Sequence, residues 1–542
     1  MLKRLVNSYP LLTLCIIFMV MLLPNLNVLE VTIMEARNFI TAREMLSDNN
    51  WLLTTMNGEA RYEKPPLPTW LTAISASVFG IKSVFAMRLP AALFVVLLVV
   101  FVFKLSNKLT QNTFFAFRNA LIVGSSFYVI GIIIEAPWDI FTHGFMCVSL
   151  YYLFQFFEHE KFHFKYALPA SVFLGCSFLS KGPVSLYALL LPFLLAYGFT
   201  FTYKPFSKKL IAIVSIIVVG ILLGGWWYLY VRTYDPITFT AIAEKETGNW
   251  SSYNVRPFYY YWSFFTQSGI WTIPAFISLL YPYLKNRVRH LKAYQFSLLW
   301  TLLAVVLLSI IPEKKSRYLM PVLIPLSINI SFYIDYLIRE FKTLKDKRET
   351  FPIYFNFGLI GLIGIVFSFL AGWFLKHNLD GYYFYFISSS IILLGIGVLI
   401  FKSLKRKRIS TVFYLTFGLF AALLILALPL KQAFESKTYR PISNLKETSD
   451  LNLYQFNYIA PEVIWQYGDK IPAIKLEDGS IEFPKDDTFG LLTIGISPED
   501  SDYMQSLYQI EKQGVFDLNK VDTDSKQYKE RLRANYYILT KR

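Results

Sequence analysis

Long apolar segments recur along this chain, and they constrain its fold more than any other feature. A helix needs about 20 apolar residues to cross the hydrocarbon core of a bilayer, and by that measure the sequence contains about thirteen such segments. Their centres lie near Ile17, Val95, Gly124, Ser149, Phe173, Leu191, Ile217, Ile273, Leu302, Ile328, Ile365, Ile391 and Phe420. The sequence therefore predicts an α-helical polytopic membrane protein.

The composition supports this prediction. Of the 542 residues, 55% are hydrophobic and only 17% are charged, whereas about 25% of a typical soluble domain is charged. The net charge of +16 resides largely in short basic loops between apolar segments, such as 285–289 and 402–408. That distribution sets membrane topology, so we expect the lipid bilayer and no nucleic acid as a partner.

The basic loops also predict the orientation. Alternate loops are rich in lysine and arginine, which places them and the N-terminus in the cytoplasm by the positive-inside rule. An odd number of spans then puts the C-terminus outside, and we expect a bacterial cytoplasmic (inner) membrane with a periplasmic C-terminal domain. The charged stretches on the outer side are 28–83, Glu135 to Asp139, Lys181, 231–261 and Glu313 to Tyr318.

Two domains are expected. Residues 1–435 contain all the apolar segments, with 28–83 as a long first outer loop. Residues 436–542 are polar and include alternating runs at 489–494 and 536–539 beside a helix-like stretch at 504–512. They predict a small soluble α/β domain.

The first outer loop is unusual for its charge and helical periodicity. Phe39, Ala42, Met45 and Leu46 follow helical spacing, which predicts one or more amphipathic helices along the membrane surface. Charged groups held so close to a bilayer usually mark chemistry or ion pairing.

Nine short motifs together resemble a known family. They are Glu35-Ala36-Arg37, Ala42-Arg43-Glu44-Met45, Asn57-Gly58-Glu59, Tyr62 to Leu67, Arg88-Leu89-Pro90, Trp138 to Thr142, Phe178 to Val184, Arg256 to Tyr261 and Lys315 to Pro321. In this order, across residues 10 to 430, the chain resembles the bacterial aminoarabinose-lipid A transferase and protein O-mannosyltransferase superfamily. The resemblance implies a GT-C fold with about thirteen spans and a polyprenyl-phosphate sugar as donor.

One position departs from the family pattern. The family usually opens its first loop with an Asp-Glu pair whose Asp is taken as the catalytic carboxylate, but here Met34 stands at that position and Glu35 follows. We expect Glu35 to serve as the catalytic base, with Asp139 as the alternative. The competing interpretation is that Glu35 only pairs with Arg37 or Arg43.

The expected chemistry explains the cations on the outer side. A carboxylate must take the proton of a weakly nucleophilic acceptor hydroxyl, and cations must hold the phosphate that leaves. The candidate phosphate-binding residues are Lys64, Lys181, Arg317 and Tyr318, with Arg37 and Glu63 as supporting residues. In the resemblance, the lysine of Glu63-Lys64-Pro65 and the tyrosine after the late basic cluster lie near the lipid phosphate.

Each of these residues has a simpler interpretation. Lys64 fits a surface ion pair with Glu63, Lys181 fits a snorkelling lysine, and the cations near 315 fit a topology signal. Asp139 and His143 share a helix face, but the pair alone is a weak metal signal, so we expect no cofactor and no metal.

The sequence predicts an inverting glycosyltransferase with an unidentified acceptor, such as lipid A, a protein or a glycan. Two other functions stay open: a transporter or flippase for lipid-linked sugars, and a non-catalytic lipid-binding relative. A transporter predicts charges inside the spans, whereas here they collect on one side. The non-catalytic alternative rests on Met34.

Overall fold

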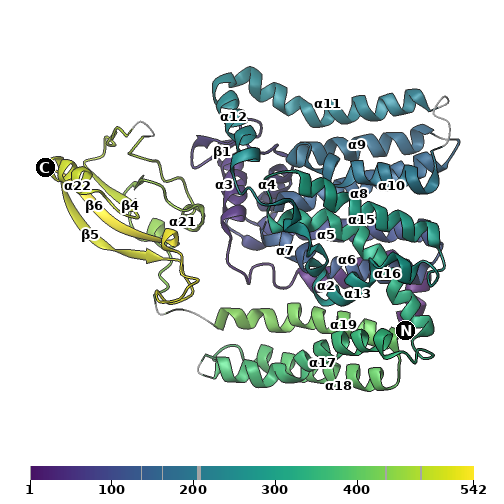
Figure 1. Ribbon diagram of the computed structural model, residues 1–542. Coiled ribbons are helices and arrows are strands. Elements are labelled where there is room, and N and C mark those ends of the chain that lie inside the picture. Colours follow the sequence, from purple (N-terminus) through teal and green to yellow (C-terminus); the bar gives the residue numbers. More distant parts are fainter. Residues whose placement is uncertain are drawn as a thin grey trace. The chain divides into compact units, whose positions relative to one another are not determined.

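The computed structural model describes residues 2–135, 137–161, 163–203, 209–376, 378–433, 436, 438–476 and 479–542. The chain packs into two compact units, which we call the helical unit and the mixed unit. The helical unit contains Met1–Val28, Tyr62–Pro68 and Arg88–Lys431. The mixed unit contains Leu29–Arg61, Thr69–Met87 and Gln432–Arg542. Figure 1 shows the helices from purple to green and the C-terminal strands in yellow.

The helical unit consists of helices of very different lengths. Its α-helices are α1 (Leu2–Ser8), α2 (Pro10–Leu22), α5 (Val84–Thr110, which begins in the mixed unit), α6 (Thr113–Gly124), α7 (Phe127–Glu135), α8 (Pro137–Glu158), α9 (His163–Lys181), α10 (Leu191–Phe201), α11 (Leu210–Tyr234), α12 (Pro236–Ser252), α13 (Thr272–Ser278), α14 (Tyr281–Leu284), α15 (Leu291–Ile310), α16 (Leu323–Glu340), α17 (Lys347–Leu375), α18 (Tyr383–Lys405) and α19 (Ile409–Ala422). Short 3₁₀ and π turns complete it: η1 (Leu186–Leu190), η2 (Phe258–Tyr261), η3 (Phe264–Trp271), η4 (Ser316–Val322), η5 (Leu423–Ala427) and η6 (Leu428–Ala433).

In the described residues, eight helical segments are long and apolar enough to cross a membrane, and four shorter apolar helices accompany them. Each of the predicted span centres lies within a helix, as for Ile17 in α2 and Ile391 in α18. The chain is therefore a multi-span membrane protein, as predicted. The number of spans, expected to be about thirteen, stays a prediction.

Small residues bring the central helices into close contact. A Cβ atom added to Gly175 of α9 would lie 2.6 Å from Leu223 Cβ on α11, and one added to Gly224 would lie 2.2 Å from Phe178 Cδ1. Glycine at these positions lets the two backbones approach, as small residues do between membrane helices. Helices α8, α9 and α11 lie side by side in Figure 1.

The mixed unit combines residues from both ends of the sequence. It contains α3 (Ile33–Ser47), β1 (Thr55–Met56), β2 (Glu59–Ala60), most of α4 (Leu67–Phe79), α20 (Leu445–Thr448), β3 (Leu453–Phe456), α21 (Pro461–Tyr467), β4 (Thr488–Thr493), α22 (Pro498–Leu507), β5 (Tyr508–Asp517), η7 (Glu530–Leu532) and β6 (Arg533–Lys541). The sheet order is β3-β4-β6-β5. Strands β3 and β4 are parallel, with Leu453 beside Gly490, whereas β6 pairs antiparallel with both β4 and β5.

The predicted amphipathic helix in the first outer loop is α3. Its apolar side chains, including Phe39 and Ile40, join Ile464 and Trp465 of α21 in one hydrophobic core. The Phe39 and Trp465 rings meet edge to face, with their centroids 5.2 Å apart. The first loop therefore folds together with the C-terminal segment. The sequence-based division at residues 435/436 places the two in different domains, whereas the structure places both in the mixed unit.

Candidate functional site

Two charged residues at helix ends form the centre of the candidate site in the helical unit. Asp139 lies in the first turn of α8, and Lys181 is the last residue of α9. The Lys181 ammonium donates to Asp139 Oδ1, and both side chains are largely buried. The other carboxylate oxygen of Asp139 is buried and accepts no hydrogen bond from the described residues. A buried carboxylate oxygen of this kind is available to a bound molecule.

The local sequence explains where Lys181 lies. Gly182 has φ of +65° and its N–H donates to Phe178 O at 2.8 Å, which ends α9 with a left-handed residue. Pro183 follows and cannot continue the helix. The motif Ser180-Lys181-Gly182-Pro183 is thus a helix stop that presents the lysine at the end of α9.

Arg317 and Tyr318 approach this pair from η4. The Lys181 Nζ atom lies 5.2 Å from the centroid of the Tyr318 ring, within the range of a cation–π contact. The Arg317 guanidinium is close enough to interact electrostatically with both Asp139 and Lys181. Its Nε is buried and forms no hydrogen bond with the described residues.

Lys64 completes the group of predicted cations. Its Nζ forms an ion pair with Glu246 Oε2 of α12 at 2.9 Å, and it interacts electrostatically with Lys181. Glu63 is exposed, and the Lys64–Glu246 pair reaches across the fold from α12. Nearby, Tyr62 donates to Asp235 Oδ2 at 3.0 Å. Burial and this bond raise the pKa of Tyr62 to about 12.

The segment around η4 is held by the preceding outer loop. Lys314 Nζ donates to the carbonyl oxygens of Arg256 at 3.0 Å and Ile311 at 2.6 Å, while Tyr261 Oη donates to Lys315 O at 3.1 Å. Lys314 is therefore a structural residue, and burial lowers its pKa. Two motifs far apart in the sequence, 256–261 and 315–321, form one structural feature.

Two carboxylates beside these cations lie in charged outer-side stretches of the sequence but were not among the predicted site residues. Glu246 pairs with Lys64 as described, and Glu313 accepts a hydrogen bond from Tyr318 Oη at 3.0 Å. Glu313 also forms an ion pair with Lys315 Nζ at 2.7 Å. Because the Lys64–Glu246 pair joins residues 182 positions apart, no local pattern predicts it.

Glu35 and Arg37 belong to the mixed unit. Glu35 is fully buried and forms a capping box with Thr32: the Thr32 N–H donates to Glu35 Oε2 at 3.0 Å, and the Glu35 N–H donates to Thr32 Oγ1. Such a box satisfies two free N–H groups at a helix start. Arg37 follows on α3, and its carbonyl accepts a hydrogen bond from Arg61 Nη1 at 2.6 Å. Glu35 thus has a clear structural role.

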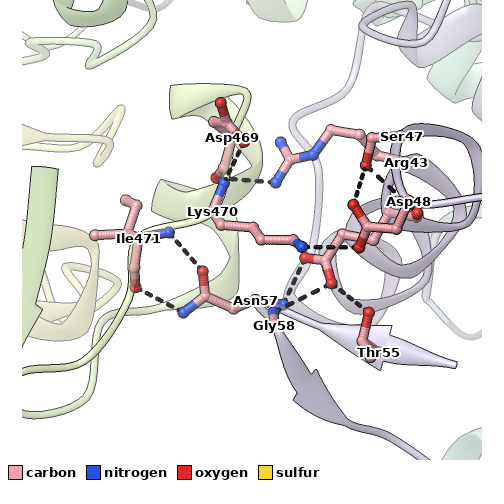
Figure 2. Close-up of polar contacts among 10 residues, drawn as sticks. Arg43, Ser47, Asp48, Thr55, Asn57, Gly58, Asp469, Lys470 and Ile471 are labelled. Atoms are coloured by element: carbon pink, nitrogen blue, oxygen red, sulfur yellow. Dashed lines mark hydrogen bonds and ion pairs between the residues drawn. The ribbon is translucent and has the colours of Figure 1, made fainter. Parts of the chain in front are cut away.

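A second polar cluster fixes the far end of α3 (Figure 2). Arg43 Nη2 donates to the Asp469 carbonyl at 3.0 Å, and the Lys470 ammonium pairs with Asp48 at 2.7 Å. Asn57 exchanges two hydrogen bonds with the backbone of Ile471, at 2.8 and 2.7 Å. The motif residues Arg43 and Asn57 therefore join the first loop to the C-terminal segment.

Glu44 organises the hairpin between β1 and β2. Its carboxylate accepts hydrogen bonds from Thr55 Oγ1 at 2.6 Å and from the backbone N–H groups of Asn57 at 2.6 Å and Gly58 at 3.2 Å. Asn57 and Gly58 both have positive φ, the conformation of a type I′ turn. The Asn57-Gly58 motif is therefore a turn signal whose donors are satisfied by a buried glutamate.

The described residues contain no group of three or more His, Cys, Asp or Glu side chains arranged to hold a metal ion. His143 lies one turn after Asp139, with its Nε2 at 3.9 Å from Asp139 Oδ1. Its Nδ1 is buried without a hydrogen-bond partner among the described residues. Two such side chains supply fewer ligands than a protein zinc site needs.

Comparison with known proteins gives related sequences and a similar solved fold. Residues 63–227 match the family model described as dolichyl-phosphate-mannose-protein mannosyltransferase. An uncharacterized protein of Aquifex aeolicus is 28% identical over 52% of this chain and 55% of its own length. An undecaprenyl phosphate-alpha-4-amino-4-deoxy-L-arabinose arabinosyl transferase of Proteus mirabilis is 25% identical over 62% of this chain and 60% of its own. The chain thus matches somewhat more than half the length of these relatives.

The similarity in fold extends further than the similarity in sequence. The crystal structure of ArnT from Cupriavidus metallidurans in the apo state matches with a TM-score of 0.68 and 15% identity, covering 99% of this chain and 98% of that one. The same protein bound to undecaprenyl phosphate matches with a TM-score of 0.65 and 14% identity, covering 99% and 97%. The chain therefore has the fold of these solved structures, which is the GT-C membrane fold expected from the sequence.

Proposed function

We propose that this protein is an inverting glycosyltransferase that moves a sugar from a polyprenyl-phosphate donor to an acceptor hydroxyl at the outer face of the membrane. The observation that carries the proposal is the grouping of Lys64, Lys181, Arg317 and Tyr318 around Asp139 within one compact unit. These four phosphate-binding candidates and the carboxylate come from separate sequence motifs. In the structure they contact one another or interact electrostatically. The matching family model and the names of the relatives support the same donor class.

The proposed reaction needs both the negatively charged carboxylate and the positively charged side chains. The acceptor oxygen attacks the anomeric carbon and forms the new glycosidic bond, while the bond from that carbon to the phosphate oxygen breaks and its electron pair leaves with the phosphate. Arg317 and the lysines stabilise the growing charge on the phosphate. Tyr318 supplies a hydroxyl donor. A carboxylate takes the proton of the acceptor hydroxyl.

Asp139 is the carboxylate that this geometry favours for the proton. Its Oδ2 is buried without a hydrogen-bond partner among the described residues and lies beside the cations. The carboxylate of Glu35, by contrast, caps the start of α3. This assignment reverses the preference expressed from the sequence, where Glu35 came first because of its place beside Met34.

The proposed setting follows from the loop charges and the relatives. We place the protein in a bacterial inner membrane, with the N-terminus in the cytoplasm and the C-terminal segment in the periplasm. The acceptor is a hydroxyl on lipid A, a protein or a glycan, and the reaction as written needs no cofactor or metal ion.

The test uses the full-length protein in lipid nanodiscs with a panel of radiolabelled undecaprenyl-phosphate sugars and a membrane extract as the acceptor pool. Release of undecaprenyl phosphate is compared for the wild type, Asp139→Asn and Glu35→Gln. We expect Asp139→Asn to lower turnover at least 100-fold, since general-base catalysis contributes about 10²–10⁴-fold. Glu59→Gln, at an exposed carboxylate of β2, is the matched control and retains wild-type activity.

Loss of turnover in Glu35→Gln alone, with the fold intact by thermal unfolding, would transfer the role of base to Glu35. Saturable binding of lipid without turnover for any donor would reject the enzyme and favour a non-catalytic binder. Movement of intact donor across a sealed vesicle membrane would identify a transporter instead.

A further inference from the structure

Most cations of the candidate site already form ion pairs with carboxylates of the protein. Lys64 pairs with Glu246, Tyr318 and Lys315 both contact Glu313 Oε1, and Lys181 pairs with Asp139. Arg317 differs, because its guanidinium Nε is buried without a hydrogen-bond partner among the described residues. Three carboxylates thus neutralise most of the positive charge that the proposed donor phosphate would use.

We propose that Glu246 and Glu313 are internal anions that compete with the lipid phosphate for its binding groups and so set the affinity for donor and product. This inference rests on the proposed function. When phosphate binds, Lys64 exchanges Glu246 for a phosphate oxygen, and Tyr318 and Lys315 exchange Glu313 in the same way. Arg317 is the group that meets the phosphate without such an exchange.

The Lys64–Glu246 ion pair is partly exposed, so a phosphate oxygen readily replaces Glu246 as the partner of Lys64. The Lys64 and Glu246 side chains are 31% and 37% exposed, and a pair this exposed is weak. Removing such a competitor strengthens anion binding by about 1.4- to 5-fold. The Glu313 carboxylate is 14% exposed and contacts two groups at once, so its removal has the larger effect.

The competition discriminates between donor and product. The donor is a phosphate diester with one negative charge, whereas the product is a monoester that carries about −1.5 to −2 at neutral pH. The product therefore binds a fully exposed cation cluster more strongly than the donor does. Carboxylates that return to Lys64 and Tyr318 oppose that product binding and promote release of the polyprenyl phosphate.

The experiment measures binding of undecaprenyl phosphate to the full-length protein in nanodiscs of phosphatidylcholine for wild type, Glu246→Gln and Glu313→Gln. The matched control is Glu244→Gln, which removes the same charge from the same helix at an exposed residue that forms no ion pair with the described residues. We expect tighter binding in Glu246→Gln than in Glu244→Gln, and the tightest in Glu313→Gln. Under turnover, Glu246→Gln lowers the donor KM and lowers kcat, because product leaves more slowly.

A merely structural carboxylate gives the opposite sign, since its loss weakens binding. Equal affinities for Glu246→Gln and Glu244→Gln would show only a general charge effect and would overturn the inference while leaving the proposed function intact. Absence of undecaprenyl phosphate binding in the wild type would overturn both. If Glu313→Gln fails to fold, the comparison between Glu246→Gln and Glu244→Gln still decides.

Discussion

Among single residues, Arg317 differs most from its neighbours in the site. Lys64, Lys181 and Tyr318 each donate a hydrogen bond to a carboxylate of the protein. The Arg317 Nε, by contrast, has no hydrogen-bond partner among the described residues. A buried donor without a partner normally costs stability. Under the proposed function the donor phosphate would complete its bonding, since a planar guanidinium fits the oxygens of a phosphate.

We therefore expect Arg317→Gln to weaken undecaprenyl phosphate binding about 10-fold or more, because hydrogen bonds to a charged group contribute roughly 1.5–3 kcal/mol. The thermal unfolding temperature should stay within experimental error of wild type. Compared with Arg317→Gln, Arg317→Lys keeps the positive charge but lacks the planar pair of N–H donors, and should recover only part of the affinity. Equal losses of stability and binding would contradict this role and make Arg317 a structural residue.

Among the elements, the end of α9 shows how the backbone places a functional side chain. Gly182 has φ of +65°, and a Cβ atom there would lie 3.0 Å from the Tyr228 hydroxyl oxygen on α11. The left-handed turn and the close approach of α11 both require glycine. Lys181 is oriented by the turn that follows it.

We expect Gly182→Ala to destabilise the protein by about 1–2 kcal/mol, the usual penalty for a left-handed residue with a side chain. It should also lower turnover, because Lys181 shifts with the turn. Gly418→Ala in α19 is the control, since its Cβ would meet no atom within 4 Å. Both are measured by thermal unfolding together with the transfer assay. Unchanged stability in Gly182→Ala would show that the turn after α9 accommodates a side chain and does not require glycine.

Element types were mostly predictable, and long-range pairing was not. The helical periodicity of the first outer loop is a local signal, and it predicted α3 correctly. Gly182-Pro183 is a local stop signal as well, and α9 ends directly before it. The stretch at 504–512 was expected to be helical, but α22 ends at Leu507 and Tyr508 begins β5. Pairing of β5 with β6 overrides the local pattern there, as tertiary contacts often do for strands.

In the candidate site, the same limit applies. Motif positions predicted a role for Lys64, Lys181, Arg317, Tyr318 and Asp139, because residue type and expected outer-side location can be read from the sequence. The partner of Lys64 is Glu246 of α12, and only the folded chain brings these two together. Glu313, by contrast, is local to its partners Lys315 and Tyr318. The capping role of Glu35 was readable in principle, since Thr32 stands three residues before it.

At the scale of the whole molecule, the mixed unit joins segments from opposite ends of the chain. The core contains Phe39 and Ile40 of α3 with Ile464 and Trp465 of α21, and Asn57 adds its paired hydrogen bonds with Ile471. Neither segment supplies this core alone. The two are therefore expected to unfold as one cooperative unit.

We expect Asn57→Ala to reduce hydrogen-exchange protection in α3 and α21 together, because it leaves two backbone groups of Ile471 without their partner. The cost is about 1–3 kcal/mol. Helices α17 and α18 in the helical unit should keep their protection, which serves as the internal control. Exchange that increases in α21 alone would mean that α3 is stable without the C-terminal segment.

The mixed unit also sets an order of events during biosynthesis. Arg43 and its carbonyl partner Asp469 are 426 residues apart, and at about 5–20 residues per second the ribosome needs on the order of 20–90 seconds to make that stretch. Throughout this interval α3 has been translated, but the α21 residues that pack against its apolar side chains do not yet exist. The first loop must therefore stay soluble and uncut in the cell while twenty-odd further elements are inserted or folded. A protease added to ribosome-bound nascent chains should cut this loop until the last strands are complete.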